Sequence, residues 1–214
     1  TAKSSMIDKV DQRSDKTKPT YQLSFRDVET GLPVTARAII KESRMFDAMY
    51  NGSDLFFSLD RTPKFFLRID AIGYFPLDTN LRVSNLEDTN HEIFLERVAP
   101  GKQMSLEGIE FLPETADFEA GAQKKLKRIR DFLALNADLK IELQGHVHHM
   151  GENNFWSKRL SRLRAKAVAD YLINAGIEDS RIEYNGYGNT EMVFPEPEND
   201  AQMQANRRVE IHIK

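Results

Sequence analysis

The chain has 214 residues, and its 30 Lys and Arg against 33 Asp and Glu give a formal net charge of −3. Hydrophobic residues make up 40% and charged residues 29%, a globular composition that allows one large domain or two small ones. The charge balance predicts no nucleic acid partner. No apolar run reaches the ~20 residues that a membrane-spanning helix needs. The lack of Cys excludes disulfides and thiolate chemistry.

The first hundred residues read as short strands that follow a polar segment. Residues 1–19 have no hydrophobic period and are predicted to be a flexible lead-in, and Asn51-Gly52 is a strong turn dipeptide. Five to seven strands at near-regular spacing, without a convincing helix, predict a small β-sandwich over residues 20–99. The expected strands begin at Tyr21, Val34, Asp54, Lys64, Leu77 and His91.

The second half alternates strand and helix patterns after the boundary at Pro100-Gly101. The amphipathic helices carry apolar residues at helical spacing, and Gly176 is placed to end the second of them. The order β-α-β-α-β-β predicts an α+β sandwich over residues 104–214. The expected elements are strands 105–111, 139–144, 181–187 and 207–214, helices 120–135 and 157–175, and a polar loop over 190–205.

Five motifs carry a family resemblance over this second half. They are IEF at 109–111, IELQGH at 141–146, LSRLRAKAVADYL at 160–172, GIEDSRIEYNGYG at 176–188 and NRRVEI at 206–211. In this order they resemble the OmpA-like C-terminal domain of outer-membrane proteins, Pal lipoproteins and flagellar MotB. The resemblance implies a periplasmic module that binds peptidoglycan.

A second resemblance concerns the first half. The segments DVETGLPVTARAII (27–40), NGSDLFFSL (51–59) and FFLRIDAIGYFP (65–76) are similar to the carboxypeptidase-regulatory-like β-sandwich, which is not itself a peptidase. The predicted fold class is therefore α+β, with an N-terminal β-sandwich followed by a βαβαββ OmpA-like domain.

The OmpA-like resemblance implies a ligand site for the diaminopimelate of the peptidoglycan stem peptide. A family Arg in the LSxxRA motif holds the carboxylate, and here that residue is Arg164. Arg207 and Arg208 open the last strand and point to opposite faces, so one of them is expected near the ligand, and we favour Arg208. Solvated or loop-bracing roles are the alternatives for all three arginines.

The loop at 145–151 departs from the family pattern. The family Asp that takes the ligand ammonium is replaced by His148, next to Val147, and an imidazole cannot replace a carboxylate there. Ser157 replaces an Asn that helps to hold the ligand. We expect Glu114 or Glu152 to be the residue that compensates, if any does.

His146, His148 and His149 also raise the question of a metal site. Imidazoles spaced i, i+2 suit transition metals, but no carboxylate motif or second His cluster accompanies them, so we expect polar loop histidines and no metal. No nucleophile elbow, phosphate loop or dinucleotide motif is present, so we expect neither an enzyme nor a cofactor. The basic stretch 124–130 is expected to be a solvated helix face, or to lie along an anionic glycan or phosphate.

Two functions remain open from the sequence. The first is a non-enzymatic periplasmic anchor that ties an outer-membrane assembly to peptidoglycan, with its signal or lipid anchor outside this chain. The second is a degenerate OmpA-like module that has lost its ligand site and acts as a scaffold for other envelope proteins. The two differ in whether an acid compensates for His148.

Overall fold

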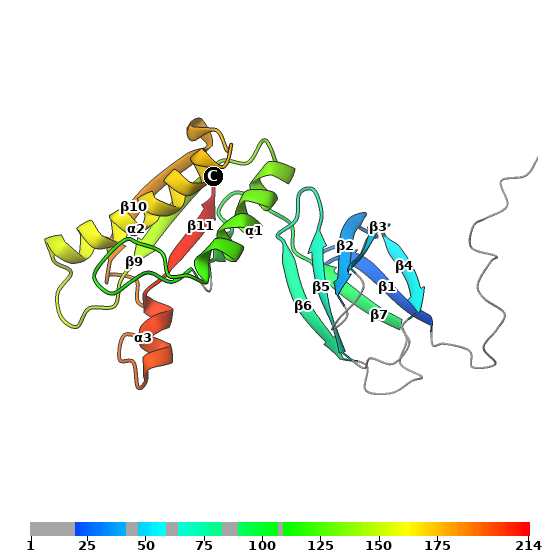
Figure 1. Cartoon of the computed structure of the whole chain (residues 1–214), viewed down its shortest axis with the longest axis horizontal. Coiled ribbons are helices and arrows are strands. Elements are labelled where there is room, and N and C mark those ends of the chain that lie inside the picture. The colour runs from blue at the N-terminus through cyan, green and yellow to red at the C-terminus, as the bar shows by residue number, and fades with distance from the viewer. Residues whose placement is uncertain (1–19, 42–46, 59–63, 83–89, 107–108) are drawn as a thin grey trace, which may run out of the picture. The chain divides into compact units, whose positions relative to one another are not determined.

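The computed structural model describes residues 20–41, 47–58, 64–82, 90–106 and 109–214. The chain forms two compact units (Figure 1). The first comprises residues through Asp70 together with Pro76–Leu95, and the second comprises Ala71–Phe75 and Glu96–Lys214. The predicted lead-in at 1–19 lies outside the described residues, and the independent folding of the two predicted domains stays a prediction.

The first unit contains strands only. One sheet has the order β4-β1-β7, with β1 antiparallel to β4 and parallel to β7, and the other has the order β3-β2-β5-β6 and is antiparallel throughout. The strands are β1 (Thr20–Asp27), β2 (Ala36–Lys41), β3 (Asp47–Gly52), β4 (Asp54–Ser58), β5 (Lys64–Asp70), β6 (Leu77–Arg82) and β7 (Asn90–Leu95).

Alternating apolar residues build the core of this unit. Along β5, Phe65, Leu67 and Ile69 are buried while the intervening residues are not, as expected for a strand with one face on a core. The ring of Phe65 meets Phe57 of β4 edge-on at 5.5 Å, so residues of the two sheets share one core. The turn expected at Asn51-Gly52 lies later, at Ser53 between β3 and β4, because Asn51 and Gly52 pair with β2 as the end of β3. The likeness to the carboxypeptidase-regulatory module stays a prediction.

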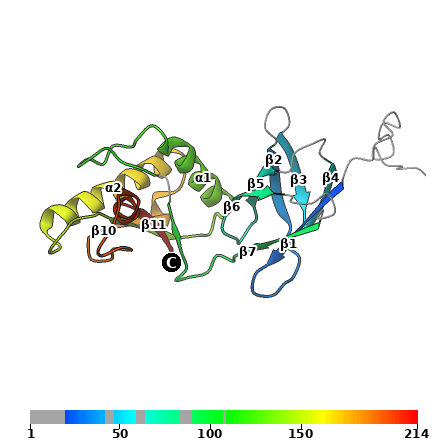
Figure 2. The same ribbon diagram turned by 90° about the horizontal axis from the view of Figure 1, so that it is seen from below.

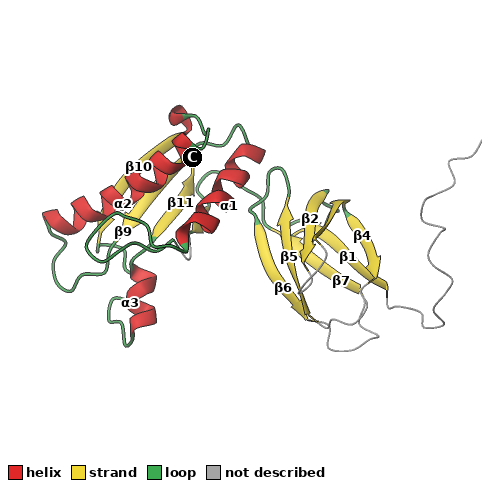
Figure 3. Cartoon of the chain, in the orientation of Figure 1, coloured by secondary structure: helices red, strands yellow, loops and turns green. Residues whose placement is uncertain are grey.

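The second unit is a four-stranded sheet with helices (Figure 3). The sheet order is β10-β9-β11-β8, with β9 parallel to β10 and antiparallel to β11. The elements are β8 (Gln103–Ser105), α1 (Ala122–Leu135), β9 (Ile141–His146), α2 (Phe155–Asn174), a short 3₁₀ helix (Asp179–Arg181), β10 (Ile182–Gly188), α3 (Asp200–Asn206) and β11 (Val209–Ile213).

Helices α1 and α2 lie against one face of this sheet (Figures 1 and 2). Leu126, Ile129 and Phe132 of α1 pack in one buried cluster with the apolar residues of α2, β9 and β11. None of the helices in the described ranges is long and apolar enough to cross a membrane. The predicted α+β fold class is confirmed.

Two local predictions in this unit are wrong. Of the strand expected at 105–111, residues 107–108 lie outside the described residues; β8 ends at Ser105, and Phe111 makes only an isolated bridge with Phe118. The loop expected at 190–205 contains α3, whose N-cap Asn199 accepts a hydrogen bond from the Gln202 amide. The sequence does not predict α3 because Asn206 is the only buried residue of this helix, so no apolar residues recur at helical spacing.

Close backbone contact joins α2 to the sheet. A Cβ atom at Gly145 of β9 would overlap the Ser161 carbonyl, and one at Gly186 of β10 would overlap backbone atoms of Lys158 and Arg162. Glycine at these two positions therefore lets α2 approach the sheet and sets the height of the helix above it.

Candidate functional site

A pocket of about 470 Å³ opens beside α2 in the second unit. Four segments far apart in the sequence form its walls: the stretch before α1, the loop after β9, the first half of α2 and the end of α3. Of the predicted site residues, the pocket brings together Arg164, His148, Val147 and Glu114. Its lining residues are Phe111, Pro113, Glu114, Glu119, Val147, His148, Leu160, Arg164, Gln204 and Arg207.

Arg164 is the most buried charge of this pocket, with only 5% of its surface exposed. Its Nε donates to the Thr115 carbonyl at 3.0 Å, and its guanidinium lies 5.1 Å from the centre of the Phe111 ring. Within the described part of the chain, no carboxylate forms an ion pair with it. Burial, and then the charge of Arg207, lower the pKa of Arg164, as expected for a cation without a compensating anion.

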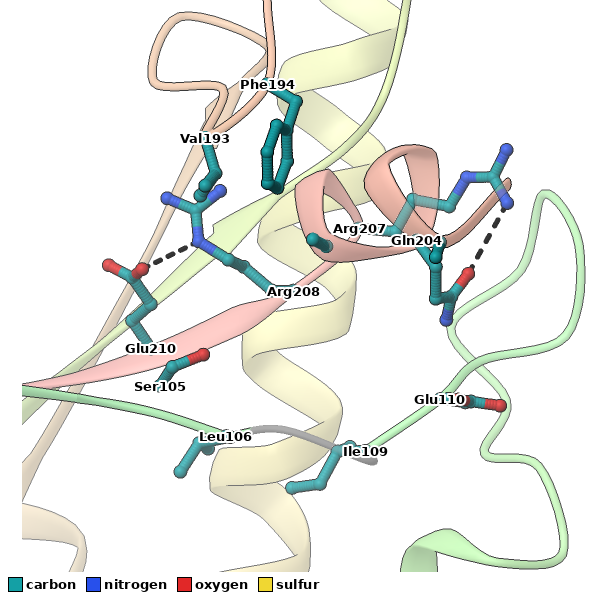
Figure 4. A pocket seen from close by; sticks show the side chains of 12 residues that line it. Ser105, Leu106, Ile109, Glu110, Val193, Phe194, Gln204, Arg207, Arg208 and Glu210 are labelled. Carbon is teal, nitrogen blue, oxygen red and sulfur yellow. Dashed lines mark hydrogen bonds and ion pairs between the residues drawn. The ribbon is translucent and has the colours of Figure 1, made fainter. Parts of the chain in front are cut away.

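The second arginine that lines this pocket is Arg207, and the favoured Arg208 lies outside it. The alternation argument assumed that the strand begins at Arg207, but β11 begins at Val209 and Arg207 caps the end of α3. Arg208 pairs with Glu210 through Nε at 2.6 Å and lines a second pocket of about 490 Å³ (Figure 4). Arg207 and Gln204 belong to the walls of both pockets.

The loop after β9 is held by main-chain and side-chain hydrogen bonds. The Val147 amide donates to the Gly188 carbonyl at 2.9 Å, and Asn206 Nδ2 lies 3.4 Å from His148 Nδ1. Burial, followed by the charges of Arg207 and His149, lowers the pKa of His148. The neutral imidazole is therefore the form that faces the pocket near pH 7.

Two carboxylates line the pocket that lacks the expected aspartate. Glu114 is exposed and has a left-handed backbone with φ 59°, and Glu119 is half-buried just before α1. Glu119 was missed because it stands outside every motif, and the bridge between Phe111 and Phe118 is what brings it to the pocket. Glu152 and the predicted Ser157 are not among the lining residues. The Ser157 amide instead donates to Asn154 at the start of α2.

The face of the sheet turned away from α1 and α2 carries polar residues. His146 is buried there, stacks on the Tyr187 ring at 5.7 Å, and has its Nε2 3.9 Å from Glu210. His146 and His148 thus have different neighbours. No group of three or more potential metal ligands occurs in residues 20–214 as far as these are described.

Stability should depend on pH through His146. Burial, and then the charge of Arg208, lowers the pKa of His146 from 6.5 to about 4 in the folded chain. The unfolded chain therefore binds the proton first as the pH falls, so the free energy of unfolding should fall by up to about 3 kcal/mol between pH 6.5 and pH 4.

Urea unfolding at pH 7, 5.5 and 4.5 checks this prediction. His146→Phe, which keeps a flat ring next to Tyr187, should flatten the dependence over this range. His149→Phe at the exposed neighbouring histidine should leave it unchanged. Equal pH dependence in the His146→Phe variant and the wild type would show that other groups cause the loss.

Comparison with known proteins gives one family match. Residues 110–207 match the OmpA family. These residues are an OmpA family domain. The matched segment begins just before the pocket residue Phe111 and ends at the pocket residue Arg207.

The curated relatives are much longer than the part that this chain matches. The chain is 32% identical over 89 residues to outer membrane porin F of Pseudomonas fluorescens, which covers 42% of the chain and 27% of that protein. It is 33% identical over 128 residues, 56% of the chain, to photosystem I P700 chlorophyll a apoprotein A2 of Gloeobacter violaceus, of which it spans 15%.

Solved structures resemble about half of the chain. An outer membrane protein of Borrelia burgdorferi B31 is 28% identical with a TM-score of 0.41, and the likeness covers 52% of this chain and 85% of that one. The peptidoglycan-associated lipoprotein of Burkholderia pseudomallei is 22% identical with a TM-score of 0.44, and covers 50% and 88%.

Proposed function

We propose that the OmpA family domain is a non-enzymatic module that binds the peptidoglycan stem peptide and anchors an envelope assembly in the periplasm. The observation that carries this proposal is Arg164, a buried guanidinium that opens on a pocket and has no carboxylate partner among the described residues. Because an unpaired buried charge is costly, this group favours an anionic ligand.

The chemistry of the pocket fits a zwitterionic ligand. A ligand carboxylate next to Arg164 and Arg207 would meet two guanidinium groups, which match carboxylates in geometry as well as in charge. A ligand ammonium would find the carboxylates of Glu114 and Glu119 on the wall that the stretch before α1 forms. The free end of diaminopimelate carries one group of each kind. The two glutamates therefore take over the role that His148 cannot perform.

A comparison of two ligands tests this assignment. Lysine differs from diaminopimelate by the absence of one carboxylate, the group assigned to Arg164 and Arg207. Titration calorimetry of the full chain should therefore show that diaminopimelate-type muropeptides bind at least about tenfold more tightly than lysine-type ones. Equal affinities would contradict the assignment, and absence of any binding would favour a scaffold function.

His148→Asp should strengthen binding. An aspartate at this position adds a third carboxylate near the ligand ammonium, so we expect affinity for diaminopimelate-type muropeptides to rise about tenfold at pH 7.5. In the wild type, protonation of His148 places a cation beside that ammonium. Since the pKa of His148 is lowered from the usual 6.5, wild-type binding should weaken only at pH values below 6.5.

Titration of both variants at pH 7.5 and 5.5 measures the two effects. His149→Asp, a change of the same charge at the exposed neighbour, is the matched control and should leave affinity unchanged. If His148→Asp binds no better than the wild type, the ammonium lies away from the loop after β9.

A further inference from the structure

Two aromatic side chains stand exposed at the start of α2. Phe155 and Trp156 are 69% and 68% exposed, and their rings meet edge-on with centres 5.5 Å apart. The guanidinium of Arg159 lies 5.7 Å from the centre of the Trp156 ring. Large apolar side chains that gather on a surface with polar groups beside them are typical of a binding site.

Trp156 precedes the pocket residue Arg164 by about two turns of α2. Trp156, Leu160 and Arg164 follow one another at four-residue intervals, so they form a row along the helix. Leu160 and Arg164 belong to the pocket wall. The row therefore continues the wall outward, and eight residues of helix separate Trp156 from Arg164 by about 12 Å along the axis.

This distance is within reach of the proposed ligand. In the stem peptide, diaminopimelate is the third residue from the muramyl sugar, so two residues and the diaminopimelate side chain separate the sugar from the group assigned to Arg164. The two residues alone span up to about 7 Å when extended, and the side chain supplies the rest. With the diaminopimelate carboxylate on Arg164, a peptide that runs along α2 toward its first turn brings the sugar to Trp156.

We propose that Trp156, with Phe155 and Arg159 beside it, is a stacking platform for the glycan strand of peptidoglycan. This inference rests on the proposed function and names the second part of the same ligand. A pyranose ring presents an apolar face of C–H groups that fits an open indole ring, and its hydroxyl and acetamido oxygens accept hydrogen bonds from the Arg159 guanidinium.

A second pocket, which shares Arg207 and Gln204 with the first, fits a sugar less well. Val193 and Phe194 belong to its walls (Figure 4). The buried walls there include the apolar Leu106 and Ile109, and the half-buried Arg208 is already paired with Glu210. The aromatic ring of this pocket, Phe194, is 36% exposed, whereas Trp156 is 68% exposed and offers a more open face to a sugar.

The experiment compares two ligands that differ only in the sugar. Trp156 is the single Trp of the chain, so its fluorescence reports on this surface alone. The stem tripeptide alone and the same tripeptide on its disaccharide are titrated into the full chain. The disaccharide form should bind about three- to tenfold more tightly and should change the emission of Trp156, whereas the tripeptide should leave the emission unchanged.

Two variants show which side chain causes the higher affinity for the disaccharide form. Trp156→Ala, measured by calorimetry, should remove the advantage of the disaccharide and keep the affinity for the tripeptide, while Phe194→Ala should change neither. If the tripeptide binds and the disaccharide adds nothing, or if Phe194→Ala rather than Trp156→Ala removes the gain, the platform is refuted and the proposed function stands. If neither ligand binds to the wild type, the proposed function fails and the platform fails with it.

Discussion

Arg164→Ala should weaken the binding of diaminopimelate-type muropeptides by at least about a hundredfold, or about 3 kcal/mol. The loss is large because Arg164 is buried and is held in place by the Thr115 carbonyl, so the ligand carboxylate meets an oriented donor group. The variant should also lose the discrimination between diaminopimelate-type and lysine-type ligands, since the group that senses the extra carboxylate is gone.

Titration calorimetry of both ligands with both proteins measures this as a double-mutant cycle. Arg162→Ala is the matched control, because Arg162 lies on the same helix but is exposed and stacks on Tyr184. Arg164→Lys keeps the positive charge but loses the planar guanidinium that can donate two parallel hydrogen bonds to a carboxylate. Its affinity should therefore lie between those of the wild type and Arg164→Ala. Unchanged discrimination in Arg164→Ala would place the carboxylate elsewhere.

Gly186→Ala should destabilise the second unit by about 3 kcal/mol or more. The added methyl group would overlap the Lys158 carbonyl and the Arg162 amide, which are backbone atoms of α2 and cannot rotate away. The helix must then lift from the sheet and lose contact between its buried residues and β9 and β10. Gly145→Ala should behave in the same way, because its methyl group would meet the Ser161 carbonyl.

Urea unfolding followed by circular dichroism measures both variants. Gly121→Ala is the control, since a Cβ at Gly121 meets no atom within 4 Å and the backbone is right-handed there, with φ −77°. Its effect should stay below about 1 kcal/mol. A Gly186→Ala protein as stable as this control would show that α2 does not lie as close to the sheet as the structure has it.

The elements that the sequence predicts well have both a regular spacing of apolar residues and a residue that marks where the element ends. Helix α2 combines buried Val168 and Leu172 at helical spacing with Gly176, whose φ of 95° ends the helix. Strand β3 and helix α3 do not have both features. Asn51-Gly52 favours a turn by local propensity, and pairing with β2 overrides it.

The candidate site could be predicted only where a motif fixes the position of a residue. The LSxxRA motif sets Arg164 by its place on α2, so the residue was found. The sequence leaves Arg207 and Arg208 as alternatives and does not point to Glu119, because their places depend on where α3 ends and on how the segment between Phe111 and Phe118 folds back. Neither tertiary feature has a periodic signal in the sequence.

The central claim is that the buried and unpaired Arg164 belongs to a pocket for the diaminopimelate of peptidoglycan. Co-sedimentation of the full chain with purified diaminopimelate-type sacculi, with and without free meso-diaminopimelate, tests it most directly. We predict that the wild type pellets with the sacculi, that the free amino acid releases it, and that Arg164→Ala stays in the supernatant. A wild-type protein that stays in the supernatant, or that pellets regardless of the competitor, would contradict the claim.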